Sequence, residues 1–410
     1  STGENLPEYE GNDDIYYNRS NDETSTQGLR DFHNLVVKKN LIMSVSERDD
    51  TLIDYAVGKA GDMSKWIRSK LKFVFGVDVS KDNIHNQIDG ACARFIRANK
   101  KYSKMHKALF VTGNSSRNIR NGDAVDTDKD KQIIKSVFGN GPKDISLLGK
   151  GVYNQYGVAE TGFNVSSCQF AMHYFFENKT TFHNFIRNIA ECTKINGYFI
   201  GTCYDGKTVF KLLENKNKNE SITIIKNDRK IYEVTKLYDR TGFPDEEMSL
   251  GYDINVYQES INKVFREYLV NFDYLTRIMD DYGFMLVTKE EAMAIGLPDG
   301  SGMFSELYSA MEEEIKQTPN RKNDYGKATY MSPEEKQISF MNRYFAFKKV
   351  RSLDVKKMSE IILNKEDATR SIVDNILENE KDVDEKITKP IIEKKKTTRK
   401  IKKHKIVLQK

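Results

Sequence analysis

The chain has few residues that would cross-link it or anchor it in a membrane. Its 410 residues include four cysteines, with no C-x-x-C spacing between any two of them. Neither a zinc site nor a disulfide framework is predicted, and a reducing compartment is the simpler interpretation. No stretch approaches the roughly 18 apolar residues that span a bilayer. The acidic start ENLPEYEGNDD also lacks the basic and apolar regions of a signal peptide. Neither membrane insertion nor secretion is therefore indicated.

Charge is distributed unevenly along the chain. The formal net charge is +5, but residues 386–410 hold eleven Lys or Arg against one acid, Glu393. The rest of the chain therefore carries a net charge of about −5. A cationic tail of this kind favours polyanion binding, because each neutralised phosphate releases counterions. A solvated end without a specific partner is an equally good interpretation.

The order of apolar patterns predicts an α/β fold. With 38% hydrophobic residues the chain can bury a core. Segments typical of strands alternate with segments long enough for helices, which favours a mostly parallel, doubly wound sheet. We expect three regions: an N-terminal arm over 1–28, a folded domain over 29–350, and a charged, basic tail over 351–410. Because the first residue is Ser, we expect the chain to be a fragment of a longer protein.

The most informative segment reads LIDYAVGKAGDMSKW, from Leu52 to Trp66. It indicates a buried strand ending at Asp54, a tight turn at Gly58, and a helix entrance at Asp62. A second strand ends at Asp78, where a carboxylate can accept both hydroxyls of an adenosine ribose. The turn lacks the G-x-G-x-x-G pattern of a pyrophosphate site and carries an acid, so a cationic cofactor is favoured over an anionic one. S-adenosylmethionine (SAM) is such a cofactor. A strand, turn and helix in an unrelated α/β core remains the alternative.

Four segments together resemble the mRNA cap guanine-N7 methyltransferases, in particular the domain in capping enzymes of large DNA viruses of the mimivirus, asfarvirus or poxvirus type. The resemblance covers roughly residues 16–350. The segments are LRDFHNLVVKKNLI, LIDYAVGKAGDMSKW, FNVSSCQFAMHYFFE and INGYFIGTCYDGK, of which the third is the most specific. The resemblance implies a class I SAM-dependent methyltransferase fold. That fold has a mostly parallel seven-stranded sheet, helices on both faces, and a small antiparallel insertion on the substrate side.

The resemblance also implies a set of site residues and no metal. The residues expected to bind SAM or its product S-adenosylhomocysteine are Lys38, Asp54, Gly58, Asp62, Asp78, Asn114, Ser115 and Gln169. Those expected to bind the cap guanine are His173, Tyr174, Glu267 and Tyr344, of which the first three would position the reacting base. Lys59 and Lys65 are instead interpreted as surface charges, and Glu267 as part of the start of a helix.

The implied reaction explains why few reactive groups are needed. Guanine N7 has an in-plane lone pair and no proton to lose, and a sulfonium methyl is already activated, so alignment is the catalytic task. A ribose 2'-O methyltransferase must deprotonate a hydroxyl with a Lys-Asp-Lys-Glu set, which is not clearly present. Two other functions stay open. One is a SAM methyltransferase for another nucleobase or a small molecule, and the other is an inactive cap- or RNA-binding module.

Four positions depart from the family pattern: Val57 replaces a cysteine, Ala60 a glycine, and Asn114 and Asn164 acids. These changes put the strength of the cofactor site in question. The implied partners are capped RNA and two further domains of the same polypeptide, a triphosphatase and a guanylyltransferase. No membrane partner is implied. The implied location is the host cytoplasm or the virion. The need for a stimulatory subunit is unknown from the sequence.

Overall fold

A computed structural model describes residues 25–378 of the chain. The predicted N-terminal arm and the end of the basic tail therefore lie largely outside the described residues. The chain divides into two units, one ending at Val355 and the other beginning at Lys356. Most of a helix over residues 355–378 belongs to the second unit. Within the described part, no helix is long and apolar enough to cross a membrane.

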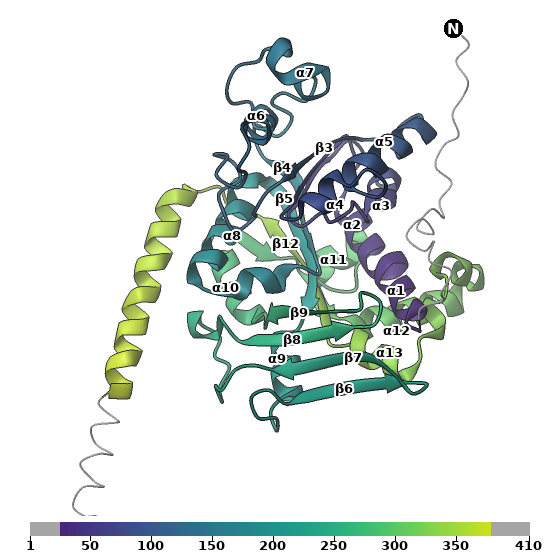
Figure 1. Ribbon diagram of the computed structural model, residues 1–410, viewed down its shortest axis with the longest axis vertical. Helices are drawn as coiled ribbons and strands as arrows, with labels where there is room; N and C mark the ends of the chain where they lie inside the picture. The colour runs from purple at the N-terminus through teal and green to yellow at the C-terminus, as the bar shows by residue number, and fades with distance from the viewer. Residues whose placement is uncertain (1–24, 379–410) are drawn as a thin grey trace, which may run out of the picture. The chain divides into compact units, whose positions relative to one another are not determined.

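The first unit is built on a mostly parallel sheet (Figure 1). Its strand order is β3-β2-β1-β4-β5-β12-β10, and β12 runs antiparallel to β5. This is the arrangement of the predicted class I methyltransferase fold, so the fold prediction is confirmed. A short eighth strand, β11, was not predicted and pairs with β12. The strands are β1 Thr51–Asp54, β2 Phe73–Asp78, β3 Lys107–Thr112, β4 Phe163–Gln169, β5 Thr193–Tyr204, β10 Phe284–Leu286, β11 Ser301–Met303 and β12 Asn342–Lys349.

A second, antiparallel sheet has the order β6-β7-β8-β9. Its strands are Ser221–Lys226, Arg229–Lys236, Asp253–Gln258 and Lys263–Tyr268. The pattern over residues 211–240 predicts a helix and two short antiparallel strands, and β6 and β7 lie there. The pattern also predicts a helix from Val264, which is wrong: β8 and β9 complete a four-stranded sheet, and the next helix, α10, begins at Phe272. Glu267 therefore lies in strand β9, where it pairs with Ile254 of β8.

The helices fill the connections between strands. The α-helices are α1 Gln27–Asp31, α2 Lys39–Val45, α3 Met63–Arg68, α4 Lys81–His85, α5 Ala91–Lys101, α6 Asp128–Val137, α7 Ile145–Tyr153, α8 Lys179–Cys192, α9 Gly206–Leu212, α10 Phe272–Asp281, α11 Lys289–Ile295, α12 Phe304–Gln317 and α13 Pro333–Ser339. The short 3-10 helices are η3 Met172–Phe176, η4 Glu247–Ser249, η5 Pro319–Tyr325 and η6 Ala328–Tyr330. Apolar residues at helical spacing from Leu29 predict a helix, which is present, but its middle, η2 Phe32–Lys38, is π-helical.

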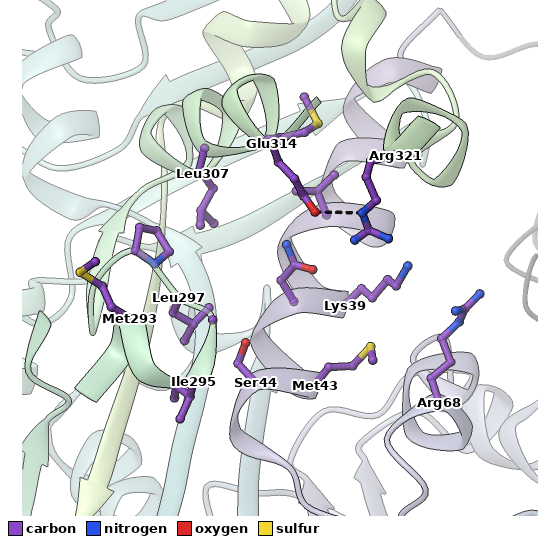
Figure 2. Close-up of a pocket in the computed structure, with 16 residues that line it drawn as sticks. Lys39, Met43, Ser44, Arg68, Met293, Ile295, Leu297, Leu307, Glu314 and Arg321 are labelled. Carbon is purple, nitrogen blue, oxygen red and sulfur yellow. Dashed lines mark hydrogen bonds and ion pairs between the residues drawn. The ribbon is translucent and has the colours of Figure 1, made fainter. Parts of the chain in front are cut away.

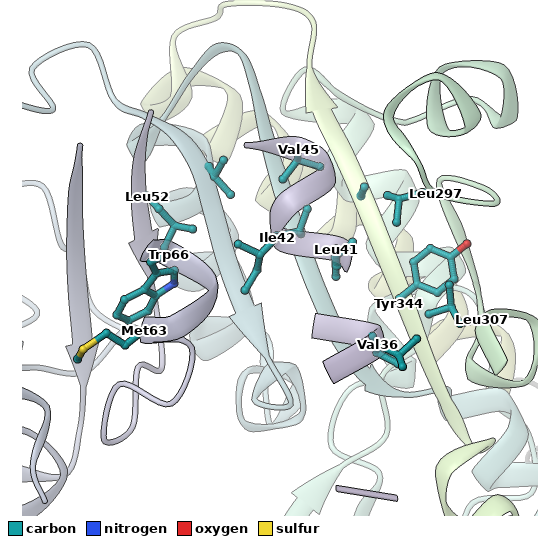
Figure 3. Packing of buried hydrophobic residues seen from close by; sticks show 14 of the residues in the cluster. Val36, Leu41, Ile42, Val45, Leu52, Met63, Trp66, Leu297, Leu307 and Tyr344 are labelled. Atoms are coloured by element: carbon teal, nitrogen blue, oxygen red, sulfur yellow. The ribbon is translucent and has the colours of Figure 1, made fainter. Parts of the chain in front are cut away.

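Both faces of the sheet are covered, which explains why its central strands are apolar throughout. Every residue of β1 and β2 is buried, as expected for parallel strands with helices on both sides. Leu52 packs with Ile42 and Trp66 on one face (Figure 3). On the other face Phe199 and Phe345 meet edge-to-face, with 5.2 Å between ring centroids. In β1 and β2 polar side chains consequently occur only at the strand ends.

One histidine is buried in this core without a hydrogen bond. His106 is 3% exposed, and neither ring nitrogen has a partner among the described residues. Its ring lies edge-on to Trp66, with the centroids 5.7 Å apart, and close to Phe95. Burial, helped by the nearby Lys107 charge, lowers the pKa of His106 to about 3. The folded protein therefore holds this imidazole in its neutral form.

We predict that His106→Phe makes the protein less sensitive to acid. The unfolded chain binds a proton at His106 below its ordinary pKa of 6.5, whereas the folded chain does so only near 3. The contribution of neutral His106 to the free energy of unfolding is therefore fully present above pH 6.5 and is lost as the pH falls below it. The loss amounts to about 2 kcal/mol by pH 5. Chemical denaturation at pH 7 and pH 5 should show that the variant avoids this loss. The exposed His85→Phe variant should behave like the wild type, and identical pH slopes for His106→Phe and the wild type would contradict the prediction.

Candidate functional site

The carboxyl ends of the parallel strands bring most of the predicted cofactor residues to one edge of the sheet. Asp54 ends β1, Asp78 ends β2, and Gln169 ends β4. Asn114 lies two residues after the end of β3. The intervening Gly113 donates its N–H to the carbonyl of Asp78 at 2.8 Å. Open α/β sheets bind ligands at this edge, because helix and strand ends there leave polar groups without regular partners.

The glycine turn after β1 is held against the end of β2. The N–H of Gly58 donates to Oδ2 of Asp78 at 2.8 Å. Oδ1 of Asp78 accepts from the Ser80 N–H at 2.9 Å and from Nδ2 of Asn83 at 3.0 Å. Gly58 has φ +55°, and a β-carbon added there would meet no atom within 4 Å. The turn therefore borders open space, as a cofactor cradle requires.

Ala60 adopts a conformation that favours glycine. Its φ is +58°, and its side chain is fully buried. A non-glycine residue in this left-handed region costs roughly 1–2 kcal/mol. The sequence departure at Ala60 is thus a local strain within the turn. Val57, the neighbouring departure, is buried, and its N–H donates to the carbonyl of Val77 at 3.0 Å.

Three charged side chains meet at the entrance of α3. Nζ of Lys38 lies 2.8 Å from Oδ1 of Asp62, and Nζ of Lys65 lies 3.3 Å from the same oxygen. Burial alone would raise the pKa of Asp62, but the two ammonium groups outweigh it and hold the pKa below its usual value. The prediction that Lys65 is a surface charge is wrong, because its side chain is 1% exposed. The spacing of three residues between Asp62 and Lys65 was the sequence signal that could have predicted this ion pair on one helix face.

Asp54 is in the opposite protonation state. Burial, followed by repulsion from Asp62, raises the pKa of Asp54 to about 8. One of its oxygens accepts from the Ala56 N–H at 3.1 Å. At neutral pH the edge of the sheet therefore holds a mostly protonated Asp54 beside an ionised Asp62.

The loop after β3 uses its polar groups internally. Oδ1 of Asn114 accepts from the Ser116 N–H, and the Ser115 hydroxyl donates to the carbonyl of Tyr55 at 2.7 Å. Gln169 bonds the hydroxyls of Ser167 and Thr202 through its amide. Asn164 lies at the other end of β4, where its oxygen accepts from the Thr51 N–H at 2.9 Å. The departure at Asn164 is therefore a tie between strands, remote from the cofactor edge.

His173, Tyr174 and Glu267 come together from separate elements. His173 and Tyr174 lie on η3, with ring centroids 4.1 Å apart, and Nε2 of His173 lies 3.7 Å from Oε1 of Glu267 on β9. Burial lowers the pKa of His173 to about 3 and raises that of Glu267 to about 8. Both groups are therefore mainly uncharged at neutral pH. Oε2 of Glu267 and Nε2 of His173 have no hydrogen-bond partner among the described residues.

Tyr344 does not join this group. Its ring is 1% exposed and packs in the core near Leu297 and Leu307 (Figure 3). Its hydroxyl donates to the carbonyl of Asp299 at 3.1 Å. Among the described residues, no hydrogen bond, ion pair or ring contact connects it with His173, Tyr174 or Glu267. The structure thus gives Tyr344 a packing role, whereas the sequence assigned it to the cap pocket.

The residues present fit SAM, the cofactor that the sequence resemblance implies. Lys38 and Asp62 offer an ammonium beside a carboxylate, which is the complement of the carboxylate and ammonium of a methionine moiety. Asp78 can accept from ribose hydroxyls, and the space beside Gly58 is free of protein atoms. A separate cavity of about 710 Å³, lined by residues such as Lys39, Met293 and Glu314, contains none of the predicted site residues (Figure 2).

Comparisons with known proteins give the family. The model of the mRNA (guanine-N(7))-methyltransferase domain matches residues 9–350. The chain is 23% identical over 380 residues to a "Probable mRNA-capping enzyme" of Acanthamoeba polyphaga mimivirus, covering 85% of this chain and 29% of that protein. It is 25% identical over 330 residues to the mRNA cap guanine-N(7) methyltransferase of Saccharomyces cerevisiae, covering 79% of this chain and 64% of that protein.

Among solved structures, the CcbJ methyltransferase of Streptomyces caelestis matches with a TM-score of 0.42 and 11% identity, over 82% of this chain and 96% of that one. Of the two relatives matched by sequence, the chain spans less than a third of the mimivirus protein and about two thirds of the yeast protein. Because the family match extends over well more than half of its residues, the chain belongs to the mRNA (guanine-N(7))-methyltransferase domain family.

Proposed function

We propose that this domain methylates N7 of the guanine in a GpppN cap, with SAM as the methyl donor. The observation that carries the proposal is the pairing of His173 with Glu267, whose outer oxygen is buried without a partner. Guanine presents two adjacent donors, N1–H and N2–H, on its Watson–Crick edge. A carboxylate accepts both, and binding there removes the cost of leaving Oε2 unsatisfied.

Each part of the site has a separate task in this proposal. SAM supplies a methyl group on a sulfonium, and N7 needs no deprotonation before it attacks. Lys38 and Asp62 hold the methionine end, and Asp78 holds the ribose. Glu267 and the 46%-exposed Tyr174 hold the guanine in the plane that aims N7 at the methyl carbon. As the base becomes cationic, the Glu267 carboxylate stabilises its charge.

The protein context is a second part of the proposal. The mimivirus relative is named a probable mRNA-capping enzyme and is more than three times as long as the matched segment. We propose that this domain works in a similar polypeptide beside triphosphatase and guanylyltransferase domains, on transcripts made in the host cytoplasm or the virion.

The direct test is methyl transfer from labelled SAM to GpppA-capped RNA, followed by nuclease digestion. We expect label in 7-methylguanosine. Label on ribose would contradict the proposal. Methylation of free nucleotide but not of GpppA would favour another small-molecule substrate. Cap binding without SAM binding in calorimetry would favour an inactive module.

The two halves of the site should separate by substitution. Asp78→Ala is expected to weaken S-adenosylhomocysteine binding at least 10-fold, because it removes the ribose acceptor and the Gly58 tie together. His173→Ala is expected to raise KM for GpppA-capped RNA while leaving S-adenosylhomocysteine affinity within about 2-fold. Isothermal calorimetry and initial rates measure these quantities. Equal loss of cofactor binding in both variants would contradict the assigned roles.

Glu267→Gln should trade stability against cap recognition. The pKa of Glu267 is about 8 in the folded protein and near 4.5 when exposed, so the folded chain holds an extra proton between these values. Stability contributed by this group is therefore lost as the pH rises from 4.5 to 8. Glutamine avoids the loss, and the variant should gain on the order of 2–3 kcal/mol between pH 5 and pH 7. Its kcat/KM should fall at least 100-fold, because an amide cannot accept from both guanine donors.

The control for this prediction is Glu290→Gln, at an exposed position in α11. It should change neither the pH dependence of unfolding nor kcat/KM. Cap affinity of the wild type should also rise towards pH 8 as Glu267 ionises. A Glu267→Gln variant that methylates capped RNA at the wild-type rate would refute the guanine-recognition role.

A further inference from the structure

A fully buried asparagine of α8 faces the loop that follows β3. Asn188 is 0% exposed. Its Nδ2 donates to the carbonyls of Ser115 and Arg117 at 2.8 and 2.7 Å, and its Oδ1 accepts from the Ile119 N–H at 2.9 Å. Both amide hydrogens and the carbonyl oxygen are thus used on one short segment of backbone. The reverse orientation of the amide would place its oxygen against two carbonyls, so the contact fixes a single arrangement.

The same loop is tied on its other side to the end of β1. The Ser115 hydroxyl donates to the carbonyl of Tyr55, the residue after Asp54. The Tyr55 hydroxyl lies 3.4 Å from the backbone carbonyl of Asn188 and 3.1 Å from the Ser166 hydroxyl. Asn188, Tyr55 and Ser115 therefore form a closed set of contacts joining α8, β1 and the loop.

We propose that Asn188 is a positioning residue for the adenosine half of the cofactor, a role that rests on the proposed SAM site, in which Asn114 and Ser115 border the adenine. Asn114 comes directly before the backbone groups that Asn188 holds at positions 115, 117 and 119. The N–H of Asn114 donates to the carbonyl of Ala124 at 2.8 Å. The loop's backbone bonds mostly within itself, as where the Ala124 N–H donates to the Asn118 carbonyl. Its place against α8 therefore depends on side-chain ties such as those of Asn188. Asn188 would act through the backbone of 115–119, because its side-chain amide bonds that backbone.

A merely structural asparagine provides the matched control. Asn271, at the start of α10, is also 0% exposed and makes three hydrogen bonds. Its Nδ2 donates to the Pro244 carbonyl and to Asp245, and its Oδ1 accepts from the Tyr274 N–H. Asn188→Ala and Asn271→Ala remove the same chemical group and the same number of hydrogen bonds. Their effects on global stability should therefore be similar, while their effects on ligand binding should differ.

The experiment measures S-adenosylhomocysteine and 7-methyl-GpppG affinities by calorimetry at a temperature where all variants are folded. Asn188→Ala should weaken S-adenosylhomocysteine binding about 10- to 30-fold and leave cap-analogue affinity within about 2-fold. Asn271→Ala should leave both within about 2-fold. Hydrogen exchange should show faster exchange of the Ile119 amide in Asn188→Ala alone. If Asn188→Ala does not fold, Asn188→Ser, which is neutral and keeps a hydroxyl donor and acceptor, carries the same expectation.

The outcomes separate this inference from the proposed function. Wild-type protein that fails to bind S-adenosylhomocysteine would overturn the proposed cofactor site and the inference with it. Wild-type binding with equal affinity losses in the Asn188 and Asn271 variants would overturn the inference alone. Unchanged S-adenosylhomocysteine affinity together with faster Ile119 exchange would do the same, because the loop would then be mobile without consequence for the cofactor.

Discussion

The burial of the central parallel strands on both faces is the constraint on which the rest of this structure depends. β1 and β2 have no exposed residue along their length, and β1 is hydrogen-bonded on both sides, to β2 and β4. Water has no access to their interior, so a polar side chain there would lack a partner. Charge can appear only where the strands end. The groups proposed to bind the cofactor consequently gather at one edge, although they are far apart in sequence.

The same desolvation sets different protonation states for neighbouring acids. Asp62 stays ionised because two ammonium groups share its oxygen, whereas Asp54 and Glu267 have raised pKa values because burial dominates. The site thus holds one fixed anion beside Lys38 and Lys65, and two carboxyls that ionise near pH 8 or when a ligand supplies donors or positive charge. A buried carboxyl of this kind destabilises the fold at neutral pH. The proposed recognition of guanine would give this destabilising carboxyl at position 267 a function.

The departures from the family motif have unequal consequences. Ala60 places a β-carbon in a left-handed conformation within the glycine turn. Asn164 only links β1 to β4 at the end opposite the cofactor edge. Asn114 directs its side-chain oxygen to the Ser116 N–H. The turn itself remains anchored, because the Gly58 N–H and the Asp78 carboxylate are in contact. The motif therefore keeps its geometry with strain at one residue.

The sequence by itself determined the alternation of strands and helices, the glycine turn, and the strand ends at Asp54 and Asp78. These follow from local rules: apolar runs of strand length, a glycine where φ is positive, and an acid where a strand meets solvent. The burial of Glu267 and Lys65, the core packing of Tyr344 and the contacts of Asn188 were decided only by the tertiary structure. The charged sequence around 267 by itself indicates a solvated helix, but the segment is strand β9 and pairs with β8. A lysine at position 65 by itself indicates a surface charge, but its side chain is buried beside the carboxylate of Asp62. Contacts between residues far apart in the chain fix burial, and burial decides which polar groups form the site.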